Sequence, residues 1–246
     1  MTYPLIILCG GKGTRLRPVV SDRPKALANI GNHAFLKYLL DYWITQGFTK
    51  IVLATGYMSA QVQRFIDKND FQADIIVSEE MLPLGTGGAL KQALHLKKAS
   101  QQSTHAIVIN GDTLNAIDCN KFVKTAIATA ADFIMLVRAP NDEDRFGKYY
   151  LTNTSEIGLI DEQHSIAVIN AGIYLINVEN TKRAMRPLPP AFSLEDDYIP
   201  QLIKSQQSSV RGIKTSSHFI DIGTPASLEY ADSYIPKHFQ IVGLQR

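Results

Sequence analysis

The sequence predicts an α/β protein in which helices cover a mostly parallel central sheet. Short apolar runs alternate with segments of helical periodicity through the first half of the chain. The first of these runs, from Leu5 to Cys9, leads directly into a glycine-rich turn. The length of 246 residues, with 45% hydrophobic and 20% charged residues, fits a globular protein that buries a large core. Strands that alternate with helical crossovers favour a parallel sheet.

The elements of the first half follow from the positions of the apolar residues. The run from Leu5 to Cys9 is apolar at successive positions, as in a strand buried on both faces. Large apolar residues then recur at helical spacing, at positions 36, 39, 40 and 43, and Gly47 ends this predicted helix. A strand is expected at 51–54. The same unit continues with a helix from about residue 59, a strand at 75–77, a helix after Gly85 and a strand at 107–109.

The second half carries shorter segments that are richer in strand formers. Candidate strands lie at 133–137, 149–151, 157–160 and 172–176. We interpret them as extensions of the same sheet together with a small β-rich subdomain that covers it. Prolines at 187, 189 and 190 mark a loop, and no Ser-rich or Gly-rich linker divides the chain. A single domain over residues 1–246 is therefore expected.

Composition and charge exclude several classes of function. The formal charge of +2 arises from 25 basic and 23 acidic residues without a long basic run, so no nucleic-acid partner is expected. Cys9 and Cys119 lie far apart, which argues against a disulfide framework and a zinc cluster. The apolar stretch at the N-terminus is too short to span a bilayer and runs into glycines. We therefore expect a cytoplasmic protein without a membrane partner.

The densest candidate site is the segment GGKGTRLRP at residues 10–18, directly after the first predicted strand. Glycines let backbone amides approach a phosphate closely, and Arg15 and Lys25 would add positive charge around it. The segment lacks the spacing of a P-loop, and Leu16 stands where a dinucleotide-binding loop would place its third glycine. The alternative is a tight strand-to-helix turn in which the glycines serve only the backbone geometry.

Two aspartates follow predicted strands and form a candidate metal site. Asp112 comes just after the strand at 107–109, and Asp221 follows a short apolar strand. Their carboxylates would project from the carboxyl edge of the sheet, where open α/β folds bind ligands. Two such carboxylates would offer hard oxygen ligands to Mg²⁺, which takes its other ligands from phosphate and water. A role in a turn or a helix cap remains the alternative for each.

These motifs together resemble the sugar-1-phosphate nucleotidyltransferases. The segment LCGGKGTRLRPVVSDRPKAL is similar to the family signature, in which a GTRL loop precedes a PK pair. Further matches follow in family order, with PLGTGGAL at 83–90, NGDT at 110–113, NAGIY at 170–174, FSLEDD at 192–197 and FIDIGTP at 219–225. The resemblance covers nearly the whole chain and is closest to the guanylyltransferases that act on heptose 1-phosphate or mannose 1-phosphate.

The resemblance implies a Rossmann-like fold of the glycosyltransferase-A type and a nucleotidyl transfer that releases pyrophosphate. The substrates would be a nucleoside triphosphate and a sugar 1-phosphate, with GTP and D-glycero-α-D-manno-heptose 1-phosphate favoured, for GDP-heptose in surface polysaccharide synthesis. Residues 1–131 would bind the nucleotide, and residues 132–235 would bind the sugar and supply the second metal ligand. No C-terminal β-helix is expected, and a homodimer is left open.

The resemblance also assigns roles to individual residues. Arg15, Lys25 and Asp112 are the expected catalytic residues, with Mg²⁺ held by Asp112 and Asp221. Thr86 could instead start a helix, and Ser193 with Asp196 could form a capping box. The expected nucleotide-binding residues are Cys9, Gly10, Gly11, Gly13, Thr14, Arg15, Lys25, Gly85, Thr86, Gly87, Gly88 and Asp112. The expected sugar-binding residues are Gly147, Asn170, Gly172, Glu195 and Asp196.

One departure from the family pattern concerns the sugar phosphate. Many members carry an acidic residue and a lysine shortly before the NAG motif, and that lysine holds the sugar phosphate. Here Gln163 occupies the lysine position, with Lys148 or His164 as candidate substitutes. Three alternatives therefore accompany the favoured reaction. They are a nucleotidyltransferase for mannose 1-phosphate or another hexose 1-phosphate with UTP, CTP or dTTP, a catalytically weak nucleotide-sugar binding regulator, and transfer to another acceptor such as phosphocholine.

Overall fold

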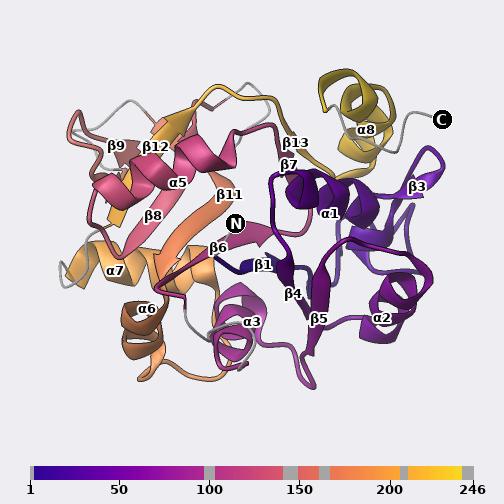
Figure 1. Cartoon of the computed structure of the whole chain (residues 1–246), viewed down its shortest axis with the longest axis horizontal. Helices are drawn as coiled ribbons and strands as arrows, with labels where there is room; N and C mark the ends of the chain where they lie inside the picture. Colours follow the sequence, from indigo (N-terminus) through magenta and orange to yellow (C-terminus); the bar gives the residue numbers. More distant parts are fainter. Residues whose placement is uncertain (1–2, 97–102, 141–148, 161–166, 206–209, 240–246) are drawn as a thin grey trace.

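A nine-stranded sheet runs through the part of the chain that is described, with helices on both of its faces (Figure 1). The computed structural model describes residues 3–96, 103–140, 149–160, 167–205 and 210–239. The main path of the sheet has the strand order β10-β9-β11-β6-β1-β4-β5, and β8 and β12 extend it from β11. The α/β class with a mostly parallel central sheet is thus confirmed.

The strands of the first half form the parallel centre of this sheet. Leu5 pairs in register with Ile51 on one side and with Ile107 on the other. Helical crossovers join these strands, as the alternation of apolar patterns predicts. The strands are β1 (Leu5–Leu8), β4 (Lys50–Thr55), β5 (Asp74–Glu79) and β6 (His105–Asn110), and the helices between them are α1 (Phe35–Thr45), α2 (Ser59–Lys68) and α3 (Gly85–Leu94).

The second half adds strands of mixed direction to the same sheet. The longest of them, β11, runs antiparallel to β6, β8 and β9, while β12 runs parallel to β8. The four strands expected from the sequence are present, and β12 is an additional one. Their bounds are β8 (Phe133–Arg138), β9 (Tyr149–Leu151), β10 (Ile157–Leu159), β11 (Ala167–Asn177) and β12 (Val210–Thr215).

The remaining elements surround the sheet and position the site. Two short antiparallel ribbons form, one of which joins segments more than a hundred residues apart. The ribbon strands are β2 (Asn29–Ile30) with β3 (His33–Ala34), and β7 (Thr113–Asn115) with β13 (Phe219–Asp221). The helices are α5 (Cys119–Ala128), α6 (Val178–Met185), α7 (Ile199–Ser205) and α8 (Pro225–His238), with a 3-10 turn η1 (Lys25–Leu27) and a π-helical turn η2 (Leu194–Tyr198).

The core lies in two layers, one on each face of the sheet. In Figure 1, α1, α5 and α8 lie above the sheet, and α3, α6 and α7 lie below it. Trp43 and Phe35 of α1 are fully buried in the upper layer, and Tyr174 and Phe133 anchor the lower one. Burying a side chain of this size stabilises the fold by about 1.5–3 kcal/mol. Both faces of β1 are consequently apolar, because helices cover each of them.

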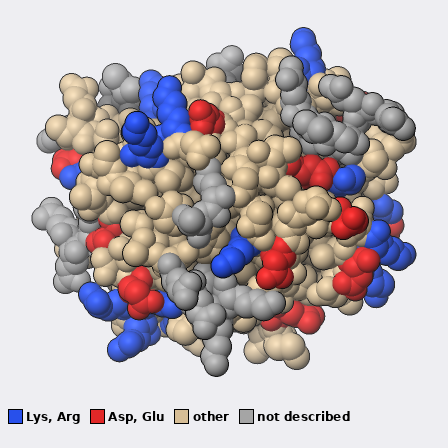
Figure 2. Space-filling view, viewed as in Figure 1, with Lys and Arg blue, Asp and Glu red and all other residues tan. Residues whose placement is uncertain are grey.

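On the face drawn in Figure 2, basic side chains lie in separate groups with acidic side chains among them. Within the described ranges, every helix is too short or too polar to cross a lipid bilayer.

Candidate active site

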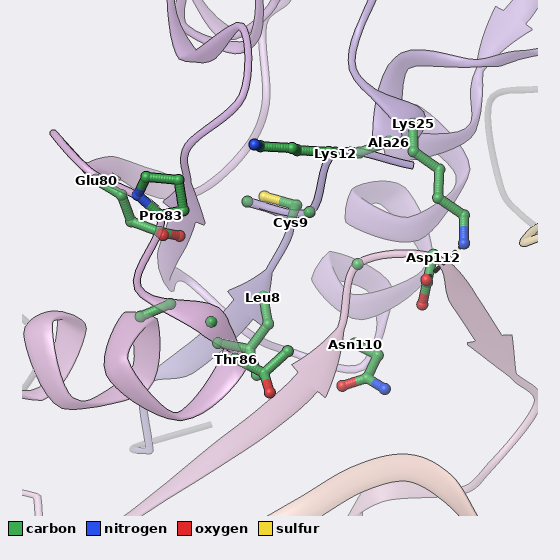
Figure 3. Close-up of a pocket in the computed structure, with 15 residues that line it drawn as sticks. Leu8, Cys9, Lys12, Lys25, Ala26, Glu80, Pro83, Thr86, Asn110 and Asp112 are labelled. Carbon is green, nitrogen blue, oxygen red and sulfur yellow. Dashed lines mark hydrogen bonds and ion pairs between the residues drawn. The ribbon is translucent and has the colours of Figure 1, made fainter. Parts of the chain in front are cut away.

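The loop after β1 borders a cavity of about 310 Å³ at the carboxyl ends of the central strands (Figure 3). Its wall consists of the end of β1 and the loop after it (residues 8–12), the start of η1 (Lys25 and Ala26), Glu80 and Pro83 after β5, the start of α3, and the end of β6 with the two residues after it (110–112). Backbone and side chains from the carboxyl ends of β1, β5 and β6 therefore line one cavity. This is the edge at which open α/β folds bind ligands.

Three glycines give the loop its shape. Gly10 and Gly11 line the cavity, and a Cβ added to Gly11 would meet no atom within 4 Å. Gly13 has a φ of +57°, a conformation that side chains rarely adopt, and a Cβ there would lie 3.1 Å from Lys25 Cβ. Gly13 thus lets the backbone turn and lets Lys25 approach the loop. Thr14 lies next to it and is exposed.

Cys9 lies at the inner wall of the cavity. The residue is buried, and burial together with the charges of Glu80 and Asp112 raises the pKa of its thiol to about 12. The thiol therefore stays neutral and acts as a small apolar group beside the cavity.

A lysine and two aspartates meet beside the glycine-rich loop. Lys25 Nζ lies 2.6 Å from Asp112 Oδ2 and 3.8 Å from Asp221 Oδ1. Lys25 is the first residue of η1, and its side chain is only 12% exposed. Proximity to two carboxylates holds the ammonium group at the end of the cavity next to Asp112, as Figure 3 shows for that pair.

The β7–β13 ribbon explains how two distant aspartates come together. Asp112 lies between the end of β6 and the start of β7, and Asp221 ends β13, where it pairs with Thr113. The Ile222 amide donates to the Asp112 carbonyl oxygen at 3.0 Å, which continues the contact beyond the ribbon. Asp221 therefore belongs to a strand rather than following one, and the strand pairing places both carboxylates around Lys25.

Arg15 joins this charged group from the exposed side of the loop. A Cβ built on Gly223 would lie 3.1 Å from an Arg15 guanidinium nitrogen, 3.2 Å from Lys25 Nζ and 2.6 Å from Asp221 Oδ1. Gly223 therefore keeps open the space in which these three groups approach one another. Arg15 also lowers the pKa of the Asp221 carboxyl.

The two carboxylates suit a hard divalent cation. Burial and the nearby charge of Asp112 raise the pKa of Asp221, although Lys25, the Gly223 amide and Arg15 lower it. The negative charge of Asp221 is thus only partly compensated, and a metal ion would stabilise the ionised form of this carboxyl group. The described residues contain no group of three or more His, Cys, Asp or Glu side chains that could hold a metal. Two carboxylates match the few protein ligands that Mg²⁺ requires when phosphate oxygens complete its shell.

The start of α3 holds four of the expected nucleotide-binding residues, and two of the four line the cavity. Gly85 and Thr86 line the cavity, but Gly87 and Gly88 do not belong to its described lining. The amides of Gly87 and Gly88 both donate to the Phe192 carbonyl oxygen, at 3.0 and 3.2 Å. A Cβ on Gly87 would lie 2.2 Å from the Phe192 ring. These two glycines therefore serve the close packing of α3 against residues 190–193.

Thr86 connects α3 to η2 instead of capping its own helix. Its hydroxyl donates to Glu195 Oε2 at 2.6 Å and accepts from the Leu194 amide at 2.8 Å. The N-cap residue of α3 is Leu84, which makes no side-chain cap bond. The capping alternative for Thr86 is therefore not what the structure shows.

Asn170, Gly172 and Glu195 lie in one hydrogen-bonded network around the irregular part of β11. The register of β11 against β8 shifts between Asn170 and Tyr174, and Gly172 has a φ of +72° there. Asn170 accepts from the Gly172 amide and donates to the Tyr174 hydroxyl, which donates to Glu195 Oε1 at 3.3 Å. The side-chain amide of Asn115 in β7 donates to the Ala171 carbonyl oxygen at 2.9 Å and so stabilises this bulge.

Asp196 lies beside Glu195, and the Ser193 hydroxyl is within hydrogen-bonding distance of both carboxylates, at 3.5 Å from Glu195 Oε2 and 3.3 Å from Asp196 Oδ2. Ser193 caps η2, because its hydroxyl accepts from the Asp196 amide at 3.0 Å. Asp196 borders a surface groove with Lys204 and does not belong to the described lining of the main cavity. Ser193 therefore caps η2, but the expected capping box with Asp196 is only half formed, because the Ser193 amide donates to Asp197 Oδ2 at 2.7 Å instead.

Four residues of the sequence-based account lie outside the described residues. They are Gly147, Lys148, Gln163 and His164.

Sequence reasoning missed Glu80 and Asn110, which both line the cavity. Glu80 directly follows β5, which ends at Glu79, and Asn110 is the last residue of β6 and the first of the NGDT segment. A signal was available for each, because polar side chains that directly follow buried strands gather at the carboxyl edge of a parallel sheet.

Comparisons with known proteins identify the family. Residues 5–238 match the family model described as nucleotidyl transferase. The chain is 34% identical to a D-glycero-alpha-D-manno-heptose 1-phosphate guanylyltransferase of Aneurinibacillus thermoaerophilus, over 89% of this chain and 93% of that protein. It is 29% identical to a mannose-1-phosphate guanylyltransferase of Mycobacterium tuberculosis, over 89% of this chain and 61% of that protein.

A solved structure has the same fold. HddC from Yersinia pseudotuberculosis, crystallised with GMP-PN, superposes with a TM-score of 0.78 and 28% identity, over 94% of this chain and 99% of that one. The family match spans almost the whole chain, including the cavity and both aspartates. The chain therefore belongs to the nucleotidyl transferase family and is a sugar-1-phosphate nucleotidyltransferase.

Proposed function

We propose that this enzyme transfers GMP from GTP to D-glycero-α-D-manno-heptose 1-phosphate and releases pyrophosphate. The observation that carries the reaction is the meeting of Lys25, Asp112 and Asp221 beside the glycine-rich loop. The similarity to heptose 1-phosphate guanylyltransferases at 34% and 32% identity supports this choice of substrates. GDP-heptose for surface polysaccharide would be the product, made in the cytoplasm where nucleoside triphosphates are available.

The transfer would be a single displacement at phosphorus. An oxygen of the sugar phosphate forms a bond to the α-phosphorus of GTP while the bond from that phosphorus to the bridging oxygen of the β-phosphate breaks. Pyrophosphate leaves with the electron pair. The attacking phosphate oxygen is already ionised at neutral pH, so the reaction needs no general base. Catalysis then depends on positioning and on neutralising charge.

The basic residues fit these two tasks. Lys25 Nζ is fixed 2.6 Å from Asp112 Oδ2, at the end of the cavity where the reacting phosphates would meet. Arg15 lies on the exposed side of Lys25 and Asp221, where a departing pyrophosphate would emerge. A preorganised positive charge that faces the developing negative charge of the transition state lowers the barrier without reorganisation.

Asp112 and Asp221 would hold the Mg²⁺ ion. When bound, the ion would offset negative charge on the phosphate oxygens and help to orient them. Burial disfavours the ionised form of Asp221 in the free protein. A bound cation would therefore stabilise this carboxylate most.

The bulge of β11 is the proposed sugar site. Asn170, Gly172 and Glu195 lie in one network that Thr86 connects to the cavity wall. Amide and carboxylate groups suit a polyol, because they accept and donate hydrogen bonds to hydroxyls. In this arrangement residues 1–131 would hold the nucleotide, and residues 132–235 would hold the sugar and contribute Asp221.

Pyrophosphate release with a substrate panel tests the proposal. The enzyme with Mg²⁺ would be given GTP, UTP, CTP, dTTP or ATP, each with heptose 1-phosphate, mannose 1-phosphate or phosphocholine. We expect turnover to be fastest with GTP and heptose 1-phosphate and to be abolished by Asp112→Ala. Fast turnover with mannose 1-phosphate or phosphocholine would name a different acceptor. Nucleotide binding without turnover across the panel would favour a binding regulator.

A further inference from the structure

The loop at 9–24, which joins β1 to η1 and carries Arg15, has little packing of its own. Its residues lie in turns, bends and irregular backbone, and most of their side chains are exposed. Leu16 is the large side chain that packs into the core, at 1% exposed. A segment of this kind loses much conformational entropy when it is ordered, so contacts from neighbouring elements must hold it.

The turn between β4 and α2 contacts this loop at three points. The Tyr57 amide donates to the Gly10 carbonyl oxygen at 3.3 Å. Arg17 Cζ lies 5.6 Å from the centroid of the Tyr57 ring, within the reach of about 6 Å for a cation–π contact. Gln61 Nε2 donates to the Asp22 carbonyl oxygen at 2.9 Å. The turn therefore holds the start, the middle and the end of the loop.

The β4–α2 turn is itself fixed. Met58 has a φ of +57°, a conformation that a residue other than glycine keeps only where its surroundings impose it. The hydroxyls of Thr55 and Ser59, which are both buried, hydrogen-bond across the turn at 2.7 Å. A Cβ on Gly56 would lie 3.1 Å from the Gly10 carbonyl oxygen, so the turn and the loop approach each other closely. The turn can thus act as a rigid support for the loop.

We propose that Tyr57 and Gln61 are positioning residues that hold the loop at 9–24 in the conformation required for nucleotidyl transfer. Arg15 lies between the two contacts of Tyr57, and Lys25 comes shortly after the contact of Gln61. Tyr57 and Gln61 lie outside the described lining of the cavity, so each acts through the loop. A cation that is already in place when negative charge develops lowers the barrier without reorganisation. The inference rests on the roles proposed for Arg15 and Lys25.

The first test is kinetic and uses the substrate pair with the highest turnover. Tyr57→Leu removes the ring, and Gln61→Met removes the side-chain donor but keeps its length. We expect kcat to fall by about 2- to 5-fold in Tyr57→Leu and by about 2- to 10-fold in Gln61→Met, from the usual strengths of a cation–π contact and a neutral hydrogen bond. The KM for the sugar 1-phosphate should stay unchanged, because the proposed sugar site lies around β11.

Two variants serve as controls for these kinetics. Tyr57→Phe keeps the ring and should restore the wild-type kcat. Gln63→Met lies on the same helix, and the amide that it removes bonds to Asp67 within α2 at 2.9 Å. Gln63→Met should therefore leave kcat and both KM values unchanged.

Limited proteolysis with trypsin measures the order of the loop without any substrate. Trypsin can cleave after Lys12 and Arg15, which are both exposed, whereas Pro18 protects the bond after Arg17. Local opening exposes such bonds to the protease, and the rate of cleavage follows the population of the open form. Cleavage after Lys12 and Arg15, followed by mass spectrometry, should be about 2- to 10-fold faster in Tyr57→Leu and Gln61→Met than in the wild type and the two controls.

The two measurements separate this inference from the proposed reaction. Faster cleavage of both variants in an enzyme that transfers nothing with any substrate pair would refute the reaction and support the holding of the loop. In an active enzyme, faster cleavage with an unchanged kcat, or a lower kcat with unchanged cleavage, would overturn the inference alone. An equal loss of kcat in Tyr57→Phe would overturn the role of the ring. If Tyr57→Leu fails to fold, the comparison of Gln61→Met with Gln63→Met decides.

Discussion

Replacing Lys25 by methionine removes the positive charge between Asp112 and Asp221 while keeping most of the apolar stem. Breaking a fully buried ion pair costs about 3–5 kcal/mol, whereas exposed pairs contribute about 0–1 kcal/mol. The side chain of Lys25 is 12% exposed, but those of Asp112 and Asp221 are 35% and 43% exposed. We therefore expect an intermediate loss of about 1–2 kcal/mol in the free energy of unfolding, after allowing for solvent screening.

This loss should lower the melting temperature by about 3–6 °C in the absence of Mg²⁺. Because two carboxylates then face each other without their cation, added Mg²⁺ should raise the melting temperature of Lys25→Met more than that of the wild type. Nucleotidyl transfer should fall by about 100-fold or more, as the preorganised charge is lost.

The assay combines thermal unfolding, with and without Mg²⁺, and pyrophosphate release. Lys37→Met is the matched control, because it removes a similar ion pair, with Asp41 at 2.7 Å, that lies on α1 away from the cavity. Because the side chains of this pair are also largely buried, at 26% and 16% exposed, Lys37→Met should lose a similar amount of stability but no activity. Transfer by Lys25→Met at the rate of Lys37→Met would refute the role assigned to Lys25.

Three further predictions follow from the geometry. Burial and the nearby charge of Asp112 raise the pKa of the Asp221 carboxyl and so disfavour its ionised form; Asp221→Asn should therefore raise the melting temperature of the protein without metal. The same substitution should lower nucleotidyl transfer by about 100-fold. A lower melting temperature would contradict this prediction. Gly172→Ala should reduce stability in urea by about 1–2 kcal/mol, since φ is +72° and the new Cβ would lie 3.0 Å from Thr113 Oγ1; an unchanged midpoint would contradict the strain. Burial raises the pKa of Cys9 and of Cys119 to about 12. The rate at which iodoacetamide labels these two cysteines in the native protein, read by mass spectrometry, should therefore still rise with pH at pH 10. A plateau of the labelling rate near pH 8.5 would contradict the pKa values.

The central sheet could be predicted because its strands are buried on both faces and are therefore continuously apolar. Leu5 to Leu8 and Ile107 to Ile109 are examples, and each stands directly before a site segment. The strand β12 was missed, because only Val210 and Ile213 of its sequence VRGIKT are large apolar residues, so it shows neither a continuous apolar run nor a period-2 alternation. The ribbon strand β13 has only three residues, and its pairing with β7 depends on contacts across the chain.

The candidate site was predictable where a residue belongs to a dense motif. Lys25 and Asp112 are examples, and strand order then accounts for their approach. Gly87 and Gly88 illustrate the limit, because a glycine-rich sequence does not reveal whether the missing side chain makes room for a ligand or for protein atoms, here the Phe192 ring and the Pro190 carbonyl oxygen. Glu80 illustrates the opposite case, since a single glutamate in a loop carries no motif and its place in the cavity depends on the Leu84 amide.

Isotope tracing with GTP labelled in either the α- or the γ-phosphate tests the central claim most directly. The proposed reaction predicts that the α-label appears in a nucleotide-sugar and the γ-label in pyrophosphate, in equal amounts and only when heptose 1-phosphate and Mg²⁺ are present. Transfer of the γ-label to the sugar, or release of the α-label as free GMP, would show a kinase or a hydrolase and would contradict nucleotidyl transfer.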